Sequence, residues 1–116
     1  MHTTDIRLFI PSKDFALSQQ FYQALGFSKA LVNDELCLFT CGECTFFLQN
    51  NYHQAFAENL MMQLIVPDIH AAFEQIESMG NLANKYQPIK NEPWGKVVYL
   101  WGPSGELWHV TELNAR

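Results

Sequence analysis

Few residues of this sequence could do chemistry, and His109 is the most suggestive of them. It stands in a strand-like run, WGPSGELWHVTEL, that follows a turn rich in glycine, proline and serine. An imidazole there could ligate a divalent metal, act as an acid or base near neutral pH, or serve as a hydrogen-bonding wall residue. Its role depends on which other side chains the fold brings beside it.

The cysteines offer a second possible chemistry. Cys41 and Cys44 have the C-x2-C spacing that can present two thiolates to one zinc ion, but no second such pair follows, and only His53 is a nearby candidate. The Gly-Glu dipeptide between them instead predicts a two-residue hairpin loop, with the cysteines facing each other at the strand ends. With Cys37 the number of cysteines is odd, which favours reduced thiols in a cytosolic protein.

Other ionisable groups have simple structural interpretations. His70 and Glu74 are one helical turn apart and could share a metal or a proton, but a solvated helix pair is by far the better explanation. Glu106 follows the turn, and we expect it to be exposed. No spacing suggests Ser-His-Asp or Cys-His catalysis, and there is no glycine-rich loop of the kind that cradles phosphate.

Composition excludes several partners. The formal charge is −5, and no cluster of Lys or Arg offers a surface for the phosphates of nucleic acid. No apolar run approaches about 18 residues, and the sequence has no secretory signal, so neither a membrane span nor export is expected. We therefore expect a cytoplasmic protein.

An internal repeat organises the chain. Residues 14–27 are echoed by residues 68–81, where an aspartate, an apolar residue eight places later, then Leu or Met and a glycine recur in register. Each copy follows a short apolar strand that ends near proline. Ser12 or Asp14 can cap the first helix and Asp68 the second, while Gly26 and Gly80 fit the left-handed position that commonly ends a helix.

Three strand-like stretches follow each helix. They cover residues 28–32, 36–40 and 45–49 in the first half, and residues 83–87, 96–101 and 106–113 in the second. The chain therefore has the pattern βαβββ twice and belongs to the α+β class. We expect one domain over residues 1–116, with module one at about 1–50, a linker at about 51–60 and module two at about 61–116.

Alternation along the strands separates two sets of side chains. The wholly apolar set, which includes Trp108, should meet the helices, because successive side chains of a strand point to opposite faces. The opposite set combines aromatic walls with a few polar groups, which is the composition of a small-molecule cavity. Its members are Arg7, Phe9, Met61, Gln63, Tyr99, Trp101 and His109.

The segments PSKDFALSQQFYQALGF and GPSGELWHVTEL, with the doubled βαβββ pattern, resemble the vicinal oxygen chelate superfamily. That superfamily includes glyoxalase I, extradiol dioxygenases, fosfomycin-resistance proteins and bleomycin-resistance proteins, and the resemblance covers almost the whole chain. It implies two βαβββ modules that form a cupped mixed β-sheet, with the helices on the convex side. It also implies a homodimer.

The resemblance also tests for a metal site. Metal-using members carry one inward ligand on the first and the last strand of each module, and these positions match Arg7, Phe46, Met61 and His109, with the fourth strand open to a shift of one residue. Arginine and phenylalanine do not ligate, and methionine is a poor ligand for hard divalent ions. The pattern therefore resembles the bleomycin-resistance branch, which binds drugs without metal catalysis.

We expect a metal-independent protein that sequesters an aromatic or amphipathic small molecule on the concave sheet face, with no cofactor. Two alternatives stay open. One is a lyase, isomerase or dioxygenase-type enzyme that uses His109 as its catalytic residue, with or without a divalent metal. The other is an interaction module whose concave face is filled by its own side chains. The predicted ligand-binding residues are Arg7, Phe9, Phe46, Met61, Gln63, Tyr99, Trp101 and His109.

Overall fold

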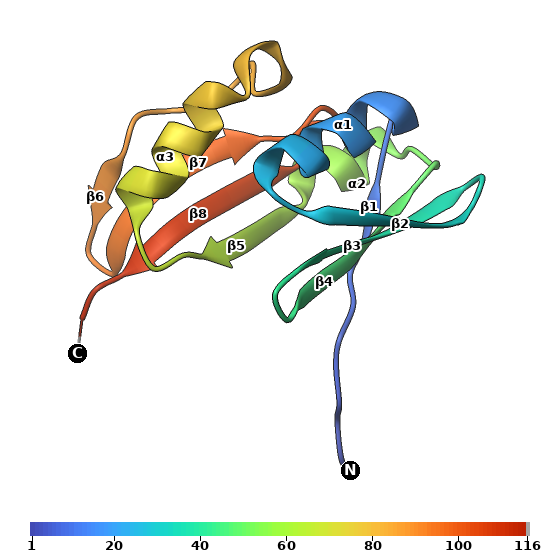
Figure 1. The fold of residues 1–116 in the computed structure, drawn as a ribbon, viewed down its shortest axis with the longest axis horizontal. Coiled ribbons are helices and arrows are strands. Elements are labelled where there is room, and N and C mark those ends of the chain that lie inside the picture. The colour runs from blue at the N-terminus through green and yellow to red at the C-terminus, as the bar shows by residue number, and fades with distance from the viewer. Residues whose placement is uncertain (116) are drawn as a thin grey trace.

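Two βαβββ modules follow one another along the chain (Figure 1). The computed structural model describes residues 1–115. Module one contains β1 (Phe9–Pro11), α1 (Phe15–Leu25), β2 (Ser28–Asn33), β3 (Leu36–Cys41) and β4 (Cys44–Gln49). A short helix, α2 (Gln54–Asn59), joins it to module two. Module two contains β5 (Met61–Ile65), α3 (Ile69–Ser78), the 3-10 turn η1 (Gly80–Leu82), β6 (Lys90–Glu92), β7 (Gly95–Trp101) and β8 (Leu107–Leu113).

Each module builds one four-stranded sheet with the same topology. The strand order is β1-β4-β3-β2 in the first sheet and β5-β8-β7-β6 in the second. In both, the first strand pairs in parallel with the last, and the other pairs are antiparallel. The predicted α+β class and the doubled βαβββ pattern are confirmed.

The two main helices begin at the predicted caps. The Asp14 carboxylate accepts a hydrogen bond from the Leu17 backbone N–H at 3.0 Å, and Asp68 likewise accepts from the first turn of α3. These bonds satisfy backbone donors that have no partner inside a helix. Gly26 ends α1 with a φ of +116°, which favours glycine. Gly80 also has a positive φ, but it opens η1 one residue after the end cap of α3, Met79.

One hydrophobic core spans both modules. Helix α3 covers β7 and β8, as Figure 1 shows, and the apolar faces of both sheets share a core with both main helices. Trp108 of β8 is only 4% exposed, and its ring lies 5.8 Å from that of Tyr22 of α1. The expectation that Trp108 is buried against a helix is therefore confirmed.

The structure departs from the predicted strands at two places. Residues 5–8, which we expected to continue the first strand, are not part of it, and the Asp5 carboxylate bonds the N–H of Ile6 instead. They belong to an arm, residues 1–8, that is joined to the sheet through the Leu8 carbonyl, which accepts from the Phe47 N–H of β4 (Figure 1). Residues 83–87 form a turn and a loop instead of a strand. This loop lies along β7, where the Gln87 N–H donates to the Tyr99 carbonyl, and the ladder strand of that edge is β6.

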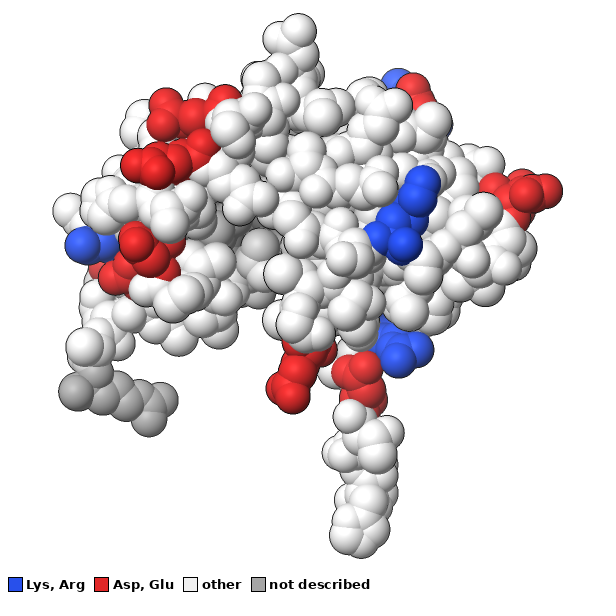
Figure 2. All heavy atoms as spheres, in the orientation of Figure 1, with Lys and Arg blue, Asp and Glu red and all other residues white. Residues whose placement is uncertain are grey.

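Figure 2 shows the charged side chains on one face of the molecule. The Lys and Arg side chains there are isolated from one another, and acidic groups lie around the periphery. Among the described helices, none combines the length and apolar character that a membrane crossing requires.

Candidate functional site

Three polar or aromatic side chains form a row across the second sheet. The strand register places Gln63 of β5 opposite His109 of β8, and His109 opposite Tyr99 of β7. The next row pairs Met61 and Trp101 with Leu107. Because Trp108 and Val110 face the helices, these side chains lie on the other face, which we call the helix-free face of module two. The predicted alternation thus brings together Met61, Gln63, Tyr99, Trp101 and His109.

His109 sits at the centre of this row with an unsatisfied polar atom. Its Nε2 is buried and has no hydrogen-bond partner among the described residues. The ring lies 4.9 Å from that of Tyr99 in an edge-to-face arrangement, and Val97 and Thr111 beside it are fully buried. Buried polar atoms in folded proteins are nearly always paired with protein or with an ordered guest, so this nitrogen requires an explanation.

Charged groups flank the row at its β6 and β7 end. The Tyr99 hydroxyl donates to Glu92 at 3.2 Å, and Glu92 is also paired with Lys90 at 3.2 Å. Partial burial and the neighbouring Glu92 carboxylate raise the pKa of Tyr99, which keeps it a neutral donor at physiological pH. The Lys85 ammonium lies 4.5 Å from the centre of the Trp101 ring, a cation–π distance.

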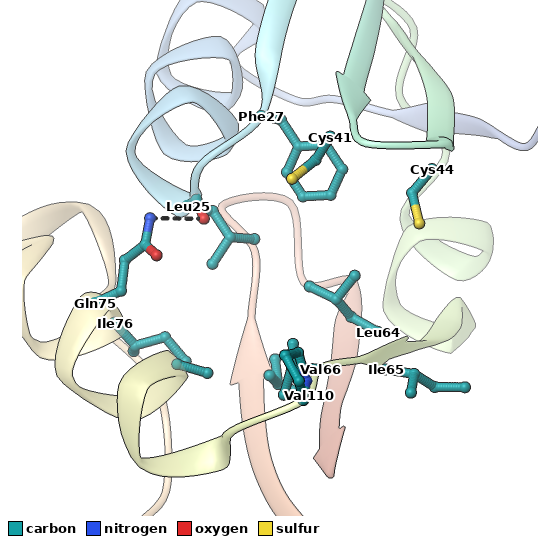
Figure 3. A pocket seen from close by; sticks show the side chains of 12 residues that line it. Leu25, Phe27, Cys41, Cys44, Leu64, Ile65, Val66, Gln75, Ile76 and Val110 are labelled. Carbon is teal, nitrogen blue, oxygen red and sulfur yellow. Dashed lines mark hydrogen bonds between the residues drawn. The ribbon is translucent and has the colours of Figure 1, made fainter. Parts of the chain in front are cut away.

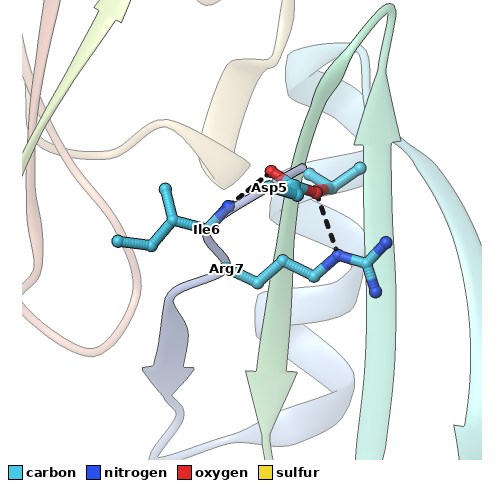
Figure 4. Close-up of polar contacts among 4 residues, drawn as sticks. Asp5, Ile6 and Arg7 are labelled. Carbon is cyan, nitrogen blue, oxygen red and sulfur yellow. Dashed lines mark hydrogen bonds and ion pairs between the residues drawn. The ribbon is translucent and has the colours of Figure 1, made fainter. Parts of the chain in front are cut away.

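Arg7 and Phe9 do not lie in this row, because both contact Phe47 of the first sheet. Phe9 stacks on Phe47 of β4 at 4.7 Å, and the Arg7 guanidinium lies 5.7 Å from the centre of the same ring. Arg7 also pairs with Asp5 at 3.2 Å on its own arm (Figure 4). The backbone hydrogen bond from Ile6, followed by the bond from Arg7, lowers the pKa of Asp5. Within residues 1–115, no hydrogen bond, ion pair or ring contact joins this pair to the row on module two.

Phe46 lies on the opposite face from the one predicted. It is 5% exposed, and its ring contacts four aromatic rings of the core: Tyr22, Phe27, Phe39 and Trp108. The register pairs Phe9 with Phe47, so Phe47 shares the face of Phe9 and Phe46 must point to the helices. The position expected for an inward residue on this strand is therefore Phe47, one residue later.

Sequence reasoning missed a cleft between the modules. Two adjoining cavities of about 270 and 290 Å³ share the walls Phe27, Cys44, Leu64 and Ile65. Figure 3 shows the side chains that line the first, including those of Cys41 and Cys44. Several walls, such as Phe27 and Leu64, belong to the helix-facing core, whereas Ile65 belongs by alternation to the opposite face of β5. Nothing in the pattern of either module indicates that the two cores stop short of each other here.

A buried polar cluster ties module two to α1. Glu106, which we expected to be exposed, is fully buried and accepts hydrogen bonds from the Tyr22 hydroxyl at 2.8 Å and the Ser104 N–H at 3.0 Å. The Tyr22 oxygen in turn accepts from Trp108 Nε1 at 3.1 Å. Burial raises the pKa of both Glu106 and Tyr22. The cluster is enclosed in the core, so it holds the fold rather than a ligand.

The side chains that the sequence resemblance matched to metal ligands do not suit a divalent ion. With Phe47 in place of Phe46 they are Arg7, Phe47, Met61 and His109, of which only the imidazole is a good ligand for a divalent ion. Across residues 1–115, no three His, Cys, Asp or Glu side chains lie close enough together to hold one ion. A catalytic zinc site typically uses three protein ligands.

Solved structures give the fold a context. No protein-family model and no curated protein matches the chain. A bleomycin resistance determinant encoded on the transposon Tn5 matches with a TM-score of 0.81 and 19% identity, over 97% of this chain and 100% of that one. The bleomycin-binding protein from Streptomyces verticillus, solved with copper(II)-bleomycin, matches with a TM-score of 0.81 and 19% identity, over 98% and 99% of the two chains.

A structure that contains a metal ion also has this fold. FosX, a fosfomycin resistance protein from Listeria monocytogenes solved with Mn(II), matches with a TM-score of 0.78 and 10% identity, over 98% of this chain and 95% of that one. These identities are low, and the agreement lies in the arrangement of the elements. The doubled βαβββ chain thus has the fold that these bleomycin-resistance proteins and FosX share.

Proposed function

We propose that this protein binds a small aromatic or amphipathic molecule, without a metal, on the helix-free face of module two. The observation that carries the proposal is the buried and unpaired Nε2 of His109, at the centre of the row Gln63–His109–Tyr99. A guest with one hydrogen-bonding group would satisfy this nitrogen. Supporting this class of function, structures with the same fold include proteins described as binding bleomycin.

The side chains around His109 suit an amphipathic guest. Trp101 and Tyr99 offer flat apolar walls, on which an aromatic ring can stack or pack edge-on. The Gln63 carboxamide can both donate and accept, so it can help orient a polar group. Lys85 beside Trp101 adds a positive charge at one end, which favours an anionic or electron-rich substituent there.

Metal independence rests on the chemistry of the donors. On the helix-free face of module two an ion would meet only the imidazole of His109 and the thioether of Met61, which are too few good donors for a tightly held divalent ion. The other two matched side chains, Arg7 and Phe47, lie together against the first sheet and do not ligate. A guanidinium brought beside the site would repel a cation, at about 4 kcal/mol for unit charges 4 Å apart with an effective dielectric near 20.

A homodimer forms part of the proposal. Three apolar side chains stand in water in one chain: Ile6 is 90% exposed, Met61 64% and Ile65 58%. The arm of residues 1–8 projects from the body of the molecule, and β5 is an edge strand with one unpaired side. A second copy related by a twofold axis would cover these groups. It would also bring Arg7 and Phe9 of one chain to the helix-free face of the other.

Fluorescence titration tests the binding proposal. Metal-free bleomycin and a set of small aromatic acids are titrated while tryptophan emission is followed, for the wild type and for His109→Ala and Trp101→Phe. Binding weakened at least tenfold by each change supports the proposed site, and Trp94→Phe, on an exposed turn, serves as the matched control. Binding to the wild type that both site variants retain unchanged would place the guest elsewhere.

Sedimentation tests the homodimer. The wild type should sediment as a dimer at micromolar concentration, and Met61→Asp or removal of residues 2–7 should shift it toward monomer. Leu31→Asp is the control, because Leu31 is 60% exposed on β2 in the other sheet. A wild type that sediments as a monomer throughout this range contradicts this part of the proposal.

The metal content of the purified protein tests metal independence. A stoichiometric metal ion that is present in the wild type and lost in His109→Ala would favour the enzyme alternative.

A further inference from the structure

The two exposed cysteines occupy opposite positions at the tip of one hairpin. Cys41 ends β3 and Cys44 begins β4, and the two are ladder partners. Directly opposed residues of an antiparallel pair project to the same side of the sheet. Both side chains line the same wall of the cleft between the modules, as Figure 3 shows.

The hairpin turn sets a backbone separation that a disulfide can span. A four-residue β-turn brings its first and last Cα atoms within about 7 Å, and cystines have Cα separations of about 4.4–6.8 Å. Gly42 has the positive φ of 59° that this turn uses, and its surroundings are open. Rotation about the two Cα–Cβ bonds is then enough to bring the sulfur atoms together, with both strands in place.

The third cysteine behaves differently. Cys37 is fully buried in the core, and burial raises the pKa of its thiol, which disfavours the reactive thiolate. Cys41 and Cys44 are open to small reagents. Because no third metal ligand lies close to them among residues 1–115, their pairing on one face makes a dithiol rather than a metal centre.

From this geometry we infer that Cys41 and Cys44 form a reversible intramolecular disulfide, a redox modification site in the wall of the cleft. The oxidant is a low-molecular-weight disulfide such as oxidised glutathione. One cysteine thiolate attacks it to give a mixed disulfide and one glutathione thiolate, and the second cysteine thiolate then displaces the other glutathione. Two protein thiols are oxidised, one glutathione disulfide is reduced, and two protons pass from the protein to the released glutathione.

Thiol counting across a redox series tests the inference. The purified full-length chain is equilibrated with mixtures of reduced and oxidised glutathione, quenched with acid, labelled with a maleimide in denaturant and weighed by mass spectrometry. We expect the labelled thiols to fall from three to one in a single step, with loss of two hydrogens and no retained glutathione. Peptide mapping should find the bond between Cys41 and Cys44, with Cys37 still labelled.

Single variants separate this pair from ordinary thiol reactivity. Cys37→Ser should lose its two remaining thiols at the same glutathione ratio as the wild type. Cys41→Ser and Cys44→Ser should each retain one glutathione on the surviving partner, because no second thiolate can displace it. Three outcomes would overturn the inference: retention of all three thiols in oxidising mixtures, stable glutathione on both cysteines of the wild type, or disulfide-linked chains on a non-reducing gel.

Discussion

The two modules share one topology but differ in what their helix-free faces carry. In module one, Phe9 stacks on Phe47 beneath the Arg7 guanidinium, and these groups satisfy one another. In module two the corresponding strands carry the row Gln63–His109–Tyr99, whose central nitrogen has no partner. The same architecture therefore presents a self-contained aromatic surface on one side and an incomplete polar one on the other.

Within each sheet the central strands are much better buried than the edge strands. All six residues of β2 are exposed, whereas β3 and β4 contribute Cys37, Phe39, Phe46 and Leu48 to the core. In module two, β7 and β8 likewise contribute Val97, Val98, Leu100 and Trp108. Tyr99 and His109 of the polar row therefore stand on central strands, and sites built on rigid elements hold their side chains more accurately.

The largest expected effect comes from Trp108, through which module two packs on α1. Trp108→Ala removes a side chain that is 4% exposed, together with its hydrogen bond to Tyr22, and should lower the free energy of unfolding by about 3–5 kcal/mol. Trp101→Ala, on the helix-free face, should cost much less. Urea melts followed by circular dichroism compare the two, and the opposite ranking would mean that the faces of module two are assigned the wrong way round.

The second largest loss of stability is expected for Tyr22→Phe. It removes the hydroxyl that both donates to Glu106 and accepts from Trp108 Nε1, so two buried polar atoms, Glu106 Oε2 and Trp108 Nε1, lose that partner, while Glu106 Oε1 keeps the Ser104 N–H. Leaving such groups unsatisfied costs about 1–3 kcal/mol. Tyr86→Phe is the control, since the Tyr86 ring only contacts Phe73 at the edge of the core. Equal denaturation midpoints for the two variants would show that the cluster does not couple the modules.

The buried Glu106 carboxyl should make the protein less stable as pH rises above about 4.5. Burial raises its pKa above the ordinary value of 4.5, so between 4.5 and the raised pKa the folded state holds a proton that the unfolded chain has released. Stability from this group is fully present below pH 4.5 and is lost as pH rises through the folded pKa. The slope cannot exceed about 1.4 kcal/mol per pH unit for one proton.

Glu106→Gln should remove that dependence. The amide cannot titrate, so the difference in unfolding free energy between wild type and variant should change with pH in this window. Glu77→Gln, at an exposed position of α3, provides the matched control. A wild-type stability that instead rises from pH 4.5 upward, in parallel with the Glu106→Gln variant, would contradict the buried position of this carboxyl.

Local signals in the sequence were enough for the elements, but not for contacts between the modules. Asp14, Asp68 and Gly26 mark helix ends through hydrogen bonds and backbone angles that involve only neighbouring residues, so they could be predicted. Phe46 was placed one residue out of register, because the pairing of Phe9 with Phe47 is set by two strands far apart in the chain. Burial of Glu106 likewise depends on Tyr22, which lies 84 residues earlier.

The cleft shows the same limit. Its walls are mostly apolar and come from both halves of the chain, and alternation gives each side chain a face without saying where the two sheets stand apart. The row on module two could be predicted, because its members alternate on adjacent strands of one repeat. The separation of this row from Arg7 and Phe9 could not be predicted, because alternation fixes the face on which a side chain lies and not the sheet that it contacts.

The smallest effect on stability is expected at His109. His109→Phe replaces a ring whose Nε2 has no partner by an apolar ring of similar shape, so no paired polar group is lost and stability should change by less than about 1 kcal/mol. In the fluorescence titration, affinity for the molecule that binds the wild type should nonetheless fall at least tenfold, which corresponds to about 1.4 kcal/mol. Trp94→Phe, on the exposed turn between β6 and β7, should leave both quantities nearly unchanged. A His109→Phe variant that is strongly destabilised would show that the fold itself uses this nitrogen, and the helix-free face would then be filled by its own side chains.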